Sequence, residues 1–145
     1  MTEELPRIPF LFTPQMDVLA CGMPDENGLK EAAEFGVKTV VNLCPAAETP
    51  LTEPGTVTAL GMDYMVIPVA TLQDLNRDNV DKLAAALDSG RGKVMVHCRS
   101  SNRVGALFAL KAFWLDGKTE QEAIALGRAA GLTKLEEGVL HLMRQ

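Results

Sequence analysis

The chain has 145 residues, of which 47% are hydrophobic and 23% are charged. That size and composition are typical of one globular domain with a single core, so we expect one domain over residues 1–145. The net charge of -5 argues against nucleic acid and anionic membranes as partners, because the surface as a whole repels polyanions. Any anion that this protein binds must therefore be captured by a local site.

Cysteine and histidine usage excludes several kinds of site. The three cysteines are odd in number and widely spaced, and there are only two histidines. Neither a disulfide framework nor a zinc centre is predicted from that pattern, and we expect no metal and no cofactor. The acidic start of the chain lacks the order of a signal peptide, and its most apolar stretch, Val104–Leu115, is too short to span a bilayer. We therefore expect a cytoplasmic protein with reduced thiols.

The first part of the chain is predicted to be extended. Residues 1–15 contain Pro6 and Pro9, and proline restricts both its own backbone and that of the preceding residue. Four short apolar runs then follow with little polar alternation, which indicates strands buried on both faces of a parallel sheet. These runs are Val18–Cys21, Thr39–Leu43, Tyr64–Ile67 and Val94–Val96.

Helical patterns lie between and after these runs. One covers residues 27–35 before Gly36, and another is capped by Asn76. Thr119 and Thr133 each have a glutamate three residues later, which is the spacing of a capping box and predicts two more helices. Strands alternating with helices predict a three-layer α/β/α fold with a small, mainly parallel sheet of four to five strands.

A polar loop, residues 97–103, connects the last predicted strand to an apolar helix that begins near Val104. The functional site of such a sheet lies beyond the carboxyl ends of its strands, and Cys98 is predicted to lie there. At a helix N-terminus, free backbone N–H groups and the helix dipole favour an anion. Arg99 and Arg103 add guanidinium groups that match the oxygens of phosphate or sulfate.

The same surroundings favour the thiolate of Cys98, which predicts that Cys98 is a nucleophile. Each of these residues also has an ordinary structural interpretation. Cys98 could be a small buried hydrophobic residue, and Arg99 could be a solvated surface arginine. For His97 the structural interpretation is favoured, in which the ring turns inward, hydrogen-bonds the neighbouring backbone and fixes the loop.

The loop His97-Cys98-Arg99-Ser100-Ser101-Asn102-Arg103 resembles the signature of cysteine-dependent protein phosphatases. The chain is most similar to the bacterial beta-lactamase-hydrolase-like phosphatase family, a group related to dual-specificity phosphatases. The resemblance runs from about Leu19 to about Met143 and includes Cys21-Gly22-Met23-Pro24, Val40-Val41-Asn42-Leu43 and Tyr64-Met65-Val66-Ile67-Pro68-Val69.

The resemblance implies a protein-tyrosine-phosphatase-like enzyme that hydrolyses a phosphomonoester without a metal. Cys98 would attack phosphorus and form a cysteinyl-phosphate, and Arg103 would hold the phosphate oxygens. The substrate would be a small phosphate ester or a phosphoprotein. The predicted phosphate-binding residues are Arg99, Ser100, Ser101, Asn102, Arg103 and Val104.

The loop departs from the phosphatase pattern at three points. Four residues, not the usual five, separate Cys98 from Arg103. Ser101 replaces a glycine, so we expect a strained backbone there, and Val104 replaces a serine or threonine that assists the leaving thiolate. The four-residue spacing is also that of rhodanese-like sulfurtransferases, in which Cys98 would carry a persulfide. The third hypothesis is a module that binds phosphate but catalyses no reaction.

Two further groups are expected near Cys98. Phosphatases of this kind use an aspartate as general acid, and Asp74 is the best candidate, with Asp78 next. Asp78 is also explained as a first-turn helix carboxylate.

Cys44 ends a predicted strand at the edge where Cys98 lies, and it corresponds to a second cysteine in phosphatases of regenerating liver. That similarity suggests a reversible Cys44–Cys98 disulfide, although an ordinary strand-end cysteine is the favoured alternative. Asn42 is expected either to hydrogen-bond the loop or to act as a plain turn residue.

Overall fold

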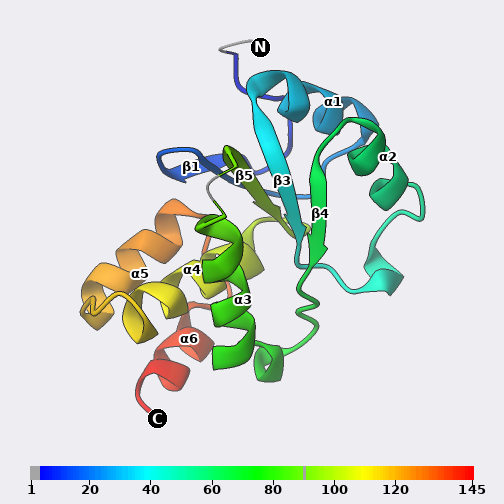
Figure 1. Ribbon diagram of the computed structural model, residues 1–145. Helices are drawn as coiled ribbons and strands as arrows, with labels where there is room; N and C mark the ends of the chain where they lie inside the picture. The colour runs from blue at the N-terminus through cyan, green and yellow to red at the C-terminus, as the bar shows by residue number, and fades with distance from the viewer. Residues whose placement is uncertain (1–3, 90) are drawn as a thin grey trace.

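The computed structural model describes residues 4–89 and 91–145, so the first three residues of the predicted arm lie outside the described residues. Its centre is one five-stranded sheet with the order β1-β2-β5-β3-β4 (Figure 1). β1 runs antiparallel to β2, and the other neighbours are parallel. The strands are β1 (Phe12–Gln15), β2 (Val18–Cys21), β3 (Val37–Asn42), β4 (Asp63–Val66) and β5 (Lys93–His97).

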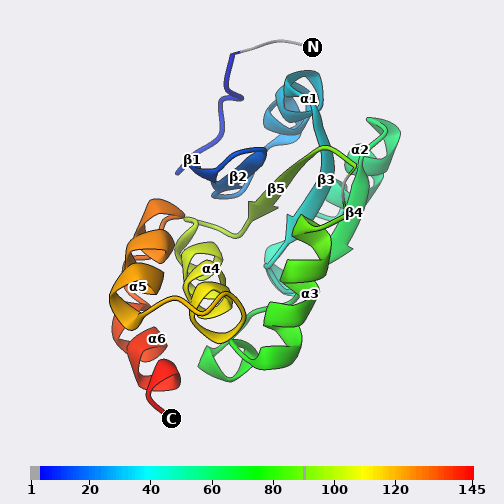
Figure 2. The same ribbon diagram turned by 60° about the vertical axis from the view of Figure 1, so that its left-hand side comes forward.

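Helices cover both faces of this sheet, which confirms the three-layer α/β/α prediction (Figures 1 and 2). One face carries α1 (Glu26–Phe35) and α2 (Glu53–Ala59), and the other carries α3 (Arg77–Leu87), α4 (Asn102–Trp114), α5 (Glu120–Ala129) and α6 (Glu136–Met143). Two short 3-10 helices, η1 (Ala46–Glu48) and η2 (Leu72–Asp74), lie in the loops after β3 and β4. No described helix is long and apolar enough to cross a membrane.

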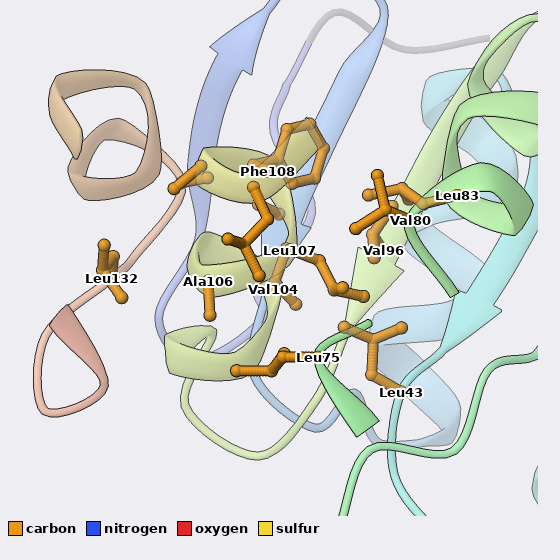
Figure 3. Close-up of a cluster of buried hydrophobic side chains, with 14 of the residues drawn as sticks. Leu43, Leu75, Val80, Leu83, Val96, Val104, Ala106, Leu107, Phe108 and Leu132 are labelled. Atoms are coloured by element: carbon orange, nitrogen blue, oxygen red, sulfur yellow. The ribbon is translucent and has the colours of Figure 1, made fainter. Parts of the chain in front are cut away.

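Helix α4 is the most buried helix, as its apolar sequence predicts. Figure 3 shows Val104 and Leu107 of α4 in one cluster with Val96 of β5 and with Val80 and Leu83 of α3. Burial of that much apolar surface fixes α4 firmly against the sheet. The N-terminus of α4, which adjoins Cys98, is therefore held in place by the core.

The structure differs from the sequence predictions at three elements. β1 lies within the predicted arm, 1–15, and pairs with β2. α2 was not predicted. The capping box predicted at Thr133 is wrong, because α6 begins at Glu136 with Leu135 at its N-cap and no side-chain cap.

Candidate active site

The loop after β5 begins beside the end of β2. Cys98 donates its backbone N–H to the carbonyl oxygen of Cys21 at 3.2 Å, and Met23 donates to the carbonyl oxygen of Arg99 at 3.4 Å. These bonds attach the first half of the loop to a neighbouring strand. Cys98 is only 1% exposed at the carboxyl edge of the sheet, where the sequence placed it.

Ser101 has the strained backbone that the sequence predicts. Its φ is +66°, in the left-handed region that disfavours residues with a Cβ. Its buried hydroxyl donates to the carbonyl oxygen of Ala130 at 2.7 Å. Gly131 packs directly against it, since a Cβ at Gly131 would lie 2.5 Å from the Ser101 Cβ. The segment before α6 therefore holds the loop in its shape.

The side chains of several predicted phosphate-binding residues make contacts within the protein. The Asn102 side-chain oxygen accepts from the backbone N–H groups of Thr133 at 2.9 Å and Leu135 at 3.3 Å. Val104 is fully buried in the core. Ser101, Asn102 and Val104 can thus serve an anion only through their backbone, and their part in phosphate binding stays a prediction. Arg99 and Ser100 are exposed at the loop.

Arg103 is the charged side chain that reaches deepest into the site. Its Nη1 donates to Glu48 Oε2 at 3.1 Å and to the Val69 carbonyl oxygen at 2.9 Å. Its Nη2 donates to Glu48 Oε1 at 2.8 Å and to Cys44 Sγ at 3.7 Å. Glu48 belongs to η1, and the sequence analysis did not identify it. The bond from Arg103 and the charge of Arg99 hold the pKa of Glu48 below its usual range.

His97 turns inward, as expected, and joins a buried polar network. Its Nδ1 lies 3.3 Å from the carbonyl oxygen of Cys98, and its Nε2 lies 3.0 Å from Glu53 Oε2. Tyr64 donates its hydroxyl to the same Glu53 oxygen at 2.6 Å. Burial and this bond to Glu53 raise the pKa of Tyr64. Glu53 and His97 are both almost fully buried, so the network fixes the ring beside Cys98.

Asn42 supports this network and makes no side-chain bond to the described loop residues 97–103. Its side-chain oxygen accepts from the backbone N–H of Cys44 at 2.8 Å. Its Nδ2 donates to Tyr64 and to Thr49, both at 2.9 Å. Asn42 therefore shapes the turn after β3, and the expected bond to the loop is replaced by these contacts.

Two further thiols lie near Cys98, and both are buried. Burial raises the pKa of Cys21, and the nearby Cys98 and Glu53 raise it further. Burial also raises the pKa of Cys44, to about 11, although Arg103 opposes the shift. The neutral thiol is thus the resting form of Cys44 at neutral pH. The predicted disulfide with Cys98 stays a prediction.

The carboxylate of Asp74 is held by its own loop. Its Oδ2 accepts from the backbone N–H groups of Ala70 at 2.8 Å and Thr71 at 3.2 Å, and these bonds lower its pKa. A general acid has to be protonated at the working pH, so these contacts favour a structural role for Asp74. Asp78 lies in the first turn of α3, where Lys82 is 3.8 Å away, as its helix interpretation predicts.

Comparison with known proteins places this chain in a family. Residues 11–113 match the family model described as beta-lactamase hydrolase-like protein, phosphatase-like domain. Beta-lactamase hydrolase-like proteins from two strains of Xylella fastidiosa, Temecula1 and 9a5c, are each 30% identical over an alignment of 131 residues that covers 86% of this chain. The chain spans about 30% of the length of these curated relatives.

Solved structures show the same fold. A candidate phosphatase (DUF442) from Shewanella putrefaciens CN-32 is 26% identical, with a TM-score of 0.72 over 94% of this chain and 92% of that chain. Tk-PTP in its active form is 21% identical, with a TM-score of 0.72 over 93% and 96%. TpbA of P. aeruginosa in complex with pTyr is 17% identical, with a TM-score of 0.66 over 93% and 83%. The chain therefore belongs to the beta-lactamase hydrolase-like family, as a phosphatase-like domain with a protein-tyrosine-phosphatase-like fold.

Proposed function

We propose that this protein hydrolyses phosphomonoesters through a covalent intermediate on Cys98. The observation that carries the proposal is one loop that holds a cysteine and, at its helical end, an arginine. Cys98 directly follows the central strand β5 and Arg103 lies in the first turn of α4, beside the unpaired N–H groups of that helix. This arrangement combines a nucleophile with a cradle for a tetrahedral anion.

The reaction has two steps. The Cys98 thiolate forms a sulfur–phosphorus bond while the phosphorus–oxygen bond of the ester breaks, and the leaving oxygen takes up a proton. Water then attacks phosphorus, the sulfur–phosphorus bond breaks, and inorganic phosphate leaves with the thiolate restored. Arg103 and the loop N–H groups stabilise the charge on the phosphate oxygens in both steps.

Aryl phosphates are the substrates that this site favours. The Asp74 carboxylate is bonded to backbone N–H groups and its pKa is lowered, so it is a poor donor to a leaving oxygen. A phenolate leaves with little help from an acid, whereas an alkoxide does not. Phosphotyrosine is such an ester, and TpbA, which shares the fold, is known in complex with it.

A paired assay tests this function. Wild type and Cys98→Ser are given an aryl phosphate and, separately, thiosulfate with a sulfur acceptor. We expect wild type to hydrolyse the aryl phosphate and Cys98→Ser to be inactive. Sulfur transfer without phosphate release would identify a sulfurtransferase, which the four-residue spacing of the loop also suits. Phosphate binding without either activity would identify a non-catalytic module.

A further inference from the structure

The guanidinium group of Arg103 is almost fully occupied by the protein itself. Its two terminal nitrogens carry four N–H bonds, and these point to the two oxygens of Glu48, the carbonyl of Val69 and the sulfur of Cys44. Within the described part of the chain, the Nε–H is the one donor of this group that makes no hydrogen bond. Arginine normally binds a phosphate through its paired terminal N–H groups. In Arg103 these groups, which we call the Arg103 fork, are already bonded within the protein and are not available to a ligand.

Glu48 reaches the arginine from a surface segment. η1 is a single short turn, and its residues Ala46 and Ala47 are exposed. The segment is held by local contacts, in which Glu48 donates its backbone N–H to Pro45 and Thr49 bonds to Pro45 and to Asn42. The Glu48 side chain is partly exposed, so solvent lies next to it when its carboxylate leaves Arg103.

The nucleophile is covered in the same arrangement. Cys98 is 1% exposed, and the side chains of Arg103 and Glu48 are 17% and 28% exposed. The carboxylate thus occupies the position of an anion on the arginine of the catalytic loop.

The Glu48–Arg103 contact persists over the whole neutral range of pH. Arg103 and Arg99 lower the pKa of Glu48, so its charge is lost only when the pH falls below the usual range for glutamate. The other charged or titratable groups near Arg103 are the thiols of Cys44 and Cys98, and the Cys44 thiol is neutral at that pH. A ligand, rather than a proton, must therefore open the contact.

We propose that Glu48 is an internal competitor of the substrate, which occupies the Arg103 fork in the resting site and must be displaced by an incoming phosphate. The inference rests on the proposed function, because it takes the loop to be the phosphate site. Its consequence is specificity: a phosphate dianion can replace a carboxylate on the fork, whereas a weaker, singly charged anion cannot. Glu48 thereby sets the affinity of the site below the value that the loop alone would give.

Oxyanion binding by Glu48→Gln tests the proposal. Affinity for inorganic phosphate and for tungstate is measured by calorimetry on wild type, Glu48→Gln and Glu34→Gln. The last variant removes the same charge from α1, on the other face of the sheet. We expect Glu48→Gln to bind both anions about tenfold more tightly than wild type, and Glu34→Gln to match wild type. Alkylation of Cys98 by iodoacetamide should also be faster in Glu48→Gln.

The sign of the effect separates the possible roles of Glu48. If Glu48 served only to orient Arg103 for the ligand, Glu48→Gln would bind the anions more weakly, and the proposal would be wrong. An equal gain in Glu34→Gln would trace the effect to net charge and would also overturn it. If neither wild type nor Glu48→Gln binds an oxyanion, the proposed function fails together with this inference, whereas binding that weakens in Glu48→Gln leaves the function intact.

Discussion

Ser101 shows how one residue in the loop stores strain. Its φ of +66° costs about 1 kcal/mol for a residue with a Cβ, and its buried bond to Ala130 offsets that cost. Ser101→Ala and Ser101→Gly both lose the bond, but only glycine relaxes the backbone. We expect Ser101→Gly to be more stable than Ser101→Ala by about 1 kcal/mol in urea unfolding. Equal stabilities would show that the position is not strained.

Glu53 is the residue on which the buried network depends. Without its carboxylate, the Nε2 of His97 and the hydroxyl of Tyr64 would lose their partner in the interior. We expect Glu53→Ala to lower the free energy of unfolding by about 3–5 kcal/mol, because two buried polar groups lose their hydrogen-bond partner. Glu53→Gln keeps two polar atoms in place and should lose less than half of that. Urea unfolding of both variants measures the difference, and similar losses would argue against a role for these bonds.

The position of the candidate site at the end of β5 was predictable from the sequence, and the contacts that hold its residues were not. Cys98 and Arg103 lie five positions apart in one short loop, so local spacing places them at a helix N-terminus. Glu48 and Glu53 lie 55 and 44 residues from their partners Arg103 and His97, and only the completed sheet brings them together. Ser101 was identified because positive φ is a local property. The contact of the Asn102 side chain was not predictable, because its partner Thr133 lies in the distant segment before α6.

Helix α4 is positioned by two close contacts between its backbone and the backbone of neighbouring residues. A Cβ at Gly105 of α4 would lie 2.2 Å from the backbone nitrogen of Leu132 and 2.6 Å from the carbonyl oxygen of Gly127 in α5. A methyl group cannot fit there without moving α4, whose first turn carries Arg103. The helix pair therefore controls the geometry of the loop.

Gly105→Ala and Gly55→Ala form a matched test of that contact. Both glycines are helical, but a Cβ at Gly55 of α2 would have no neighbour within 4 Å. We expect Gly55→Ala to raise stability by about 0.5–1 kcal/mol, because alanine favours the helix. Gly105→Ala should lower stability by about 3 kcal/mol through overpacking and should reduce turnover as well. Thermal unfolding compares them, and a neutral Gly105→Ala would contradict the close packing.

Helices and strands with strong local sequence signals were the ones that could be predicted. The strand β2 and the capping box of Thr119 were predicted as found, because apolar runs and reciprocal caps are local. α2 was missed because Pro54, Gly55 and two threonines give its seven residues little helical propensity. β1 was missed because its partly exposed residues pair with only one neighbour. At Thr133 the backbone N–H bonds to Asn102, so tertiary contact displaced a local cap.

At the scale of the whole molecule, the fold gathers a few positive groups at one place on a negative protein. The net charge is -5, yet Arg99 and Arg103 meet the N-terminus of α4 at the carboxyl edge of the sheet. A local positive site of this kind favours binding of a small anionic ester over binding of a polyanion. The other charges of a polyanion would face the acidic surface of the protein. Membership of a phosphatase-like family agrees with a site of that kind.

The central claim is that Cys98 becomes phosphorylated during turnover. Wild type is mixed with excess aryl phosphate, quenched within milliseconds in acid, digested and analysed by mass spectrometry. Cys98→Ser and Arg103→Met are the controls. We predict one added phosphoryl group on the peptide that contains Cys98 in wild type, and none in either variant. Phosphate release from wild type with no phosphorylated Cys98 peptide, or a phosphoryl group on another residue, would contradict the account.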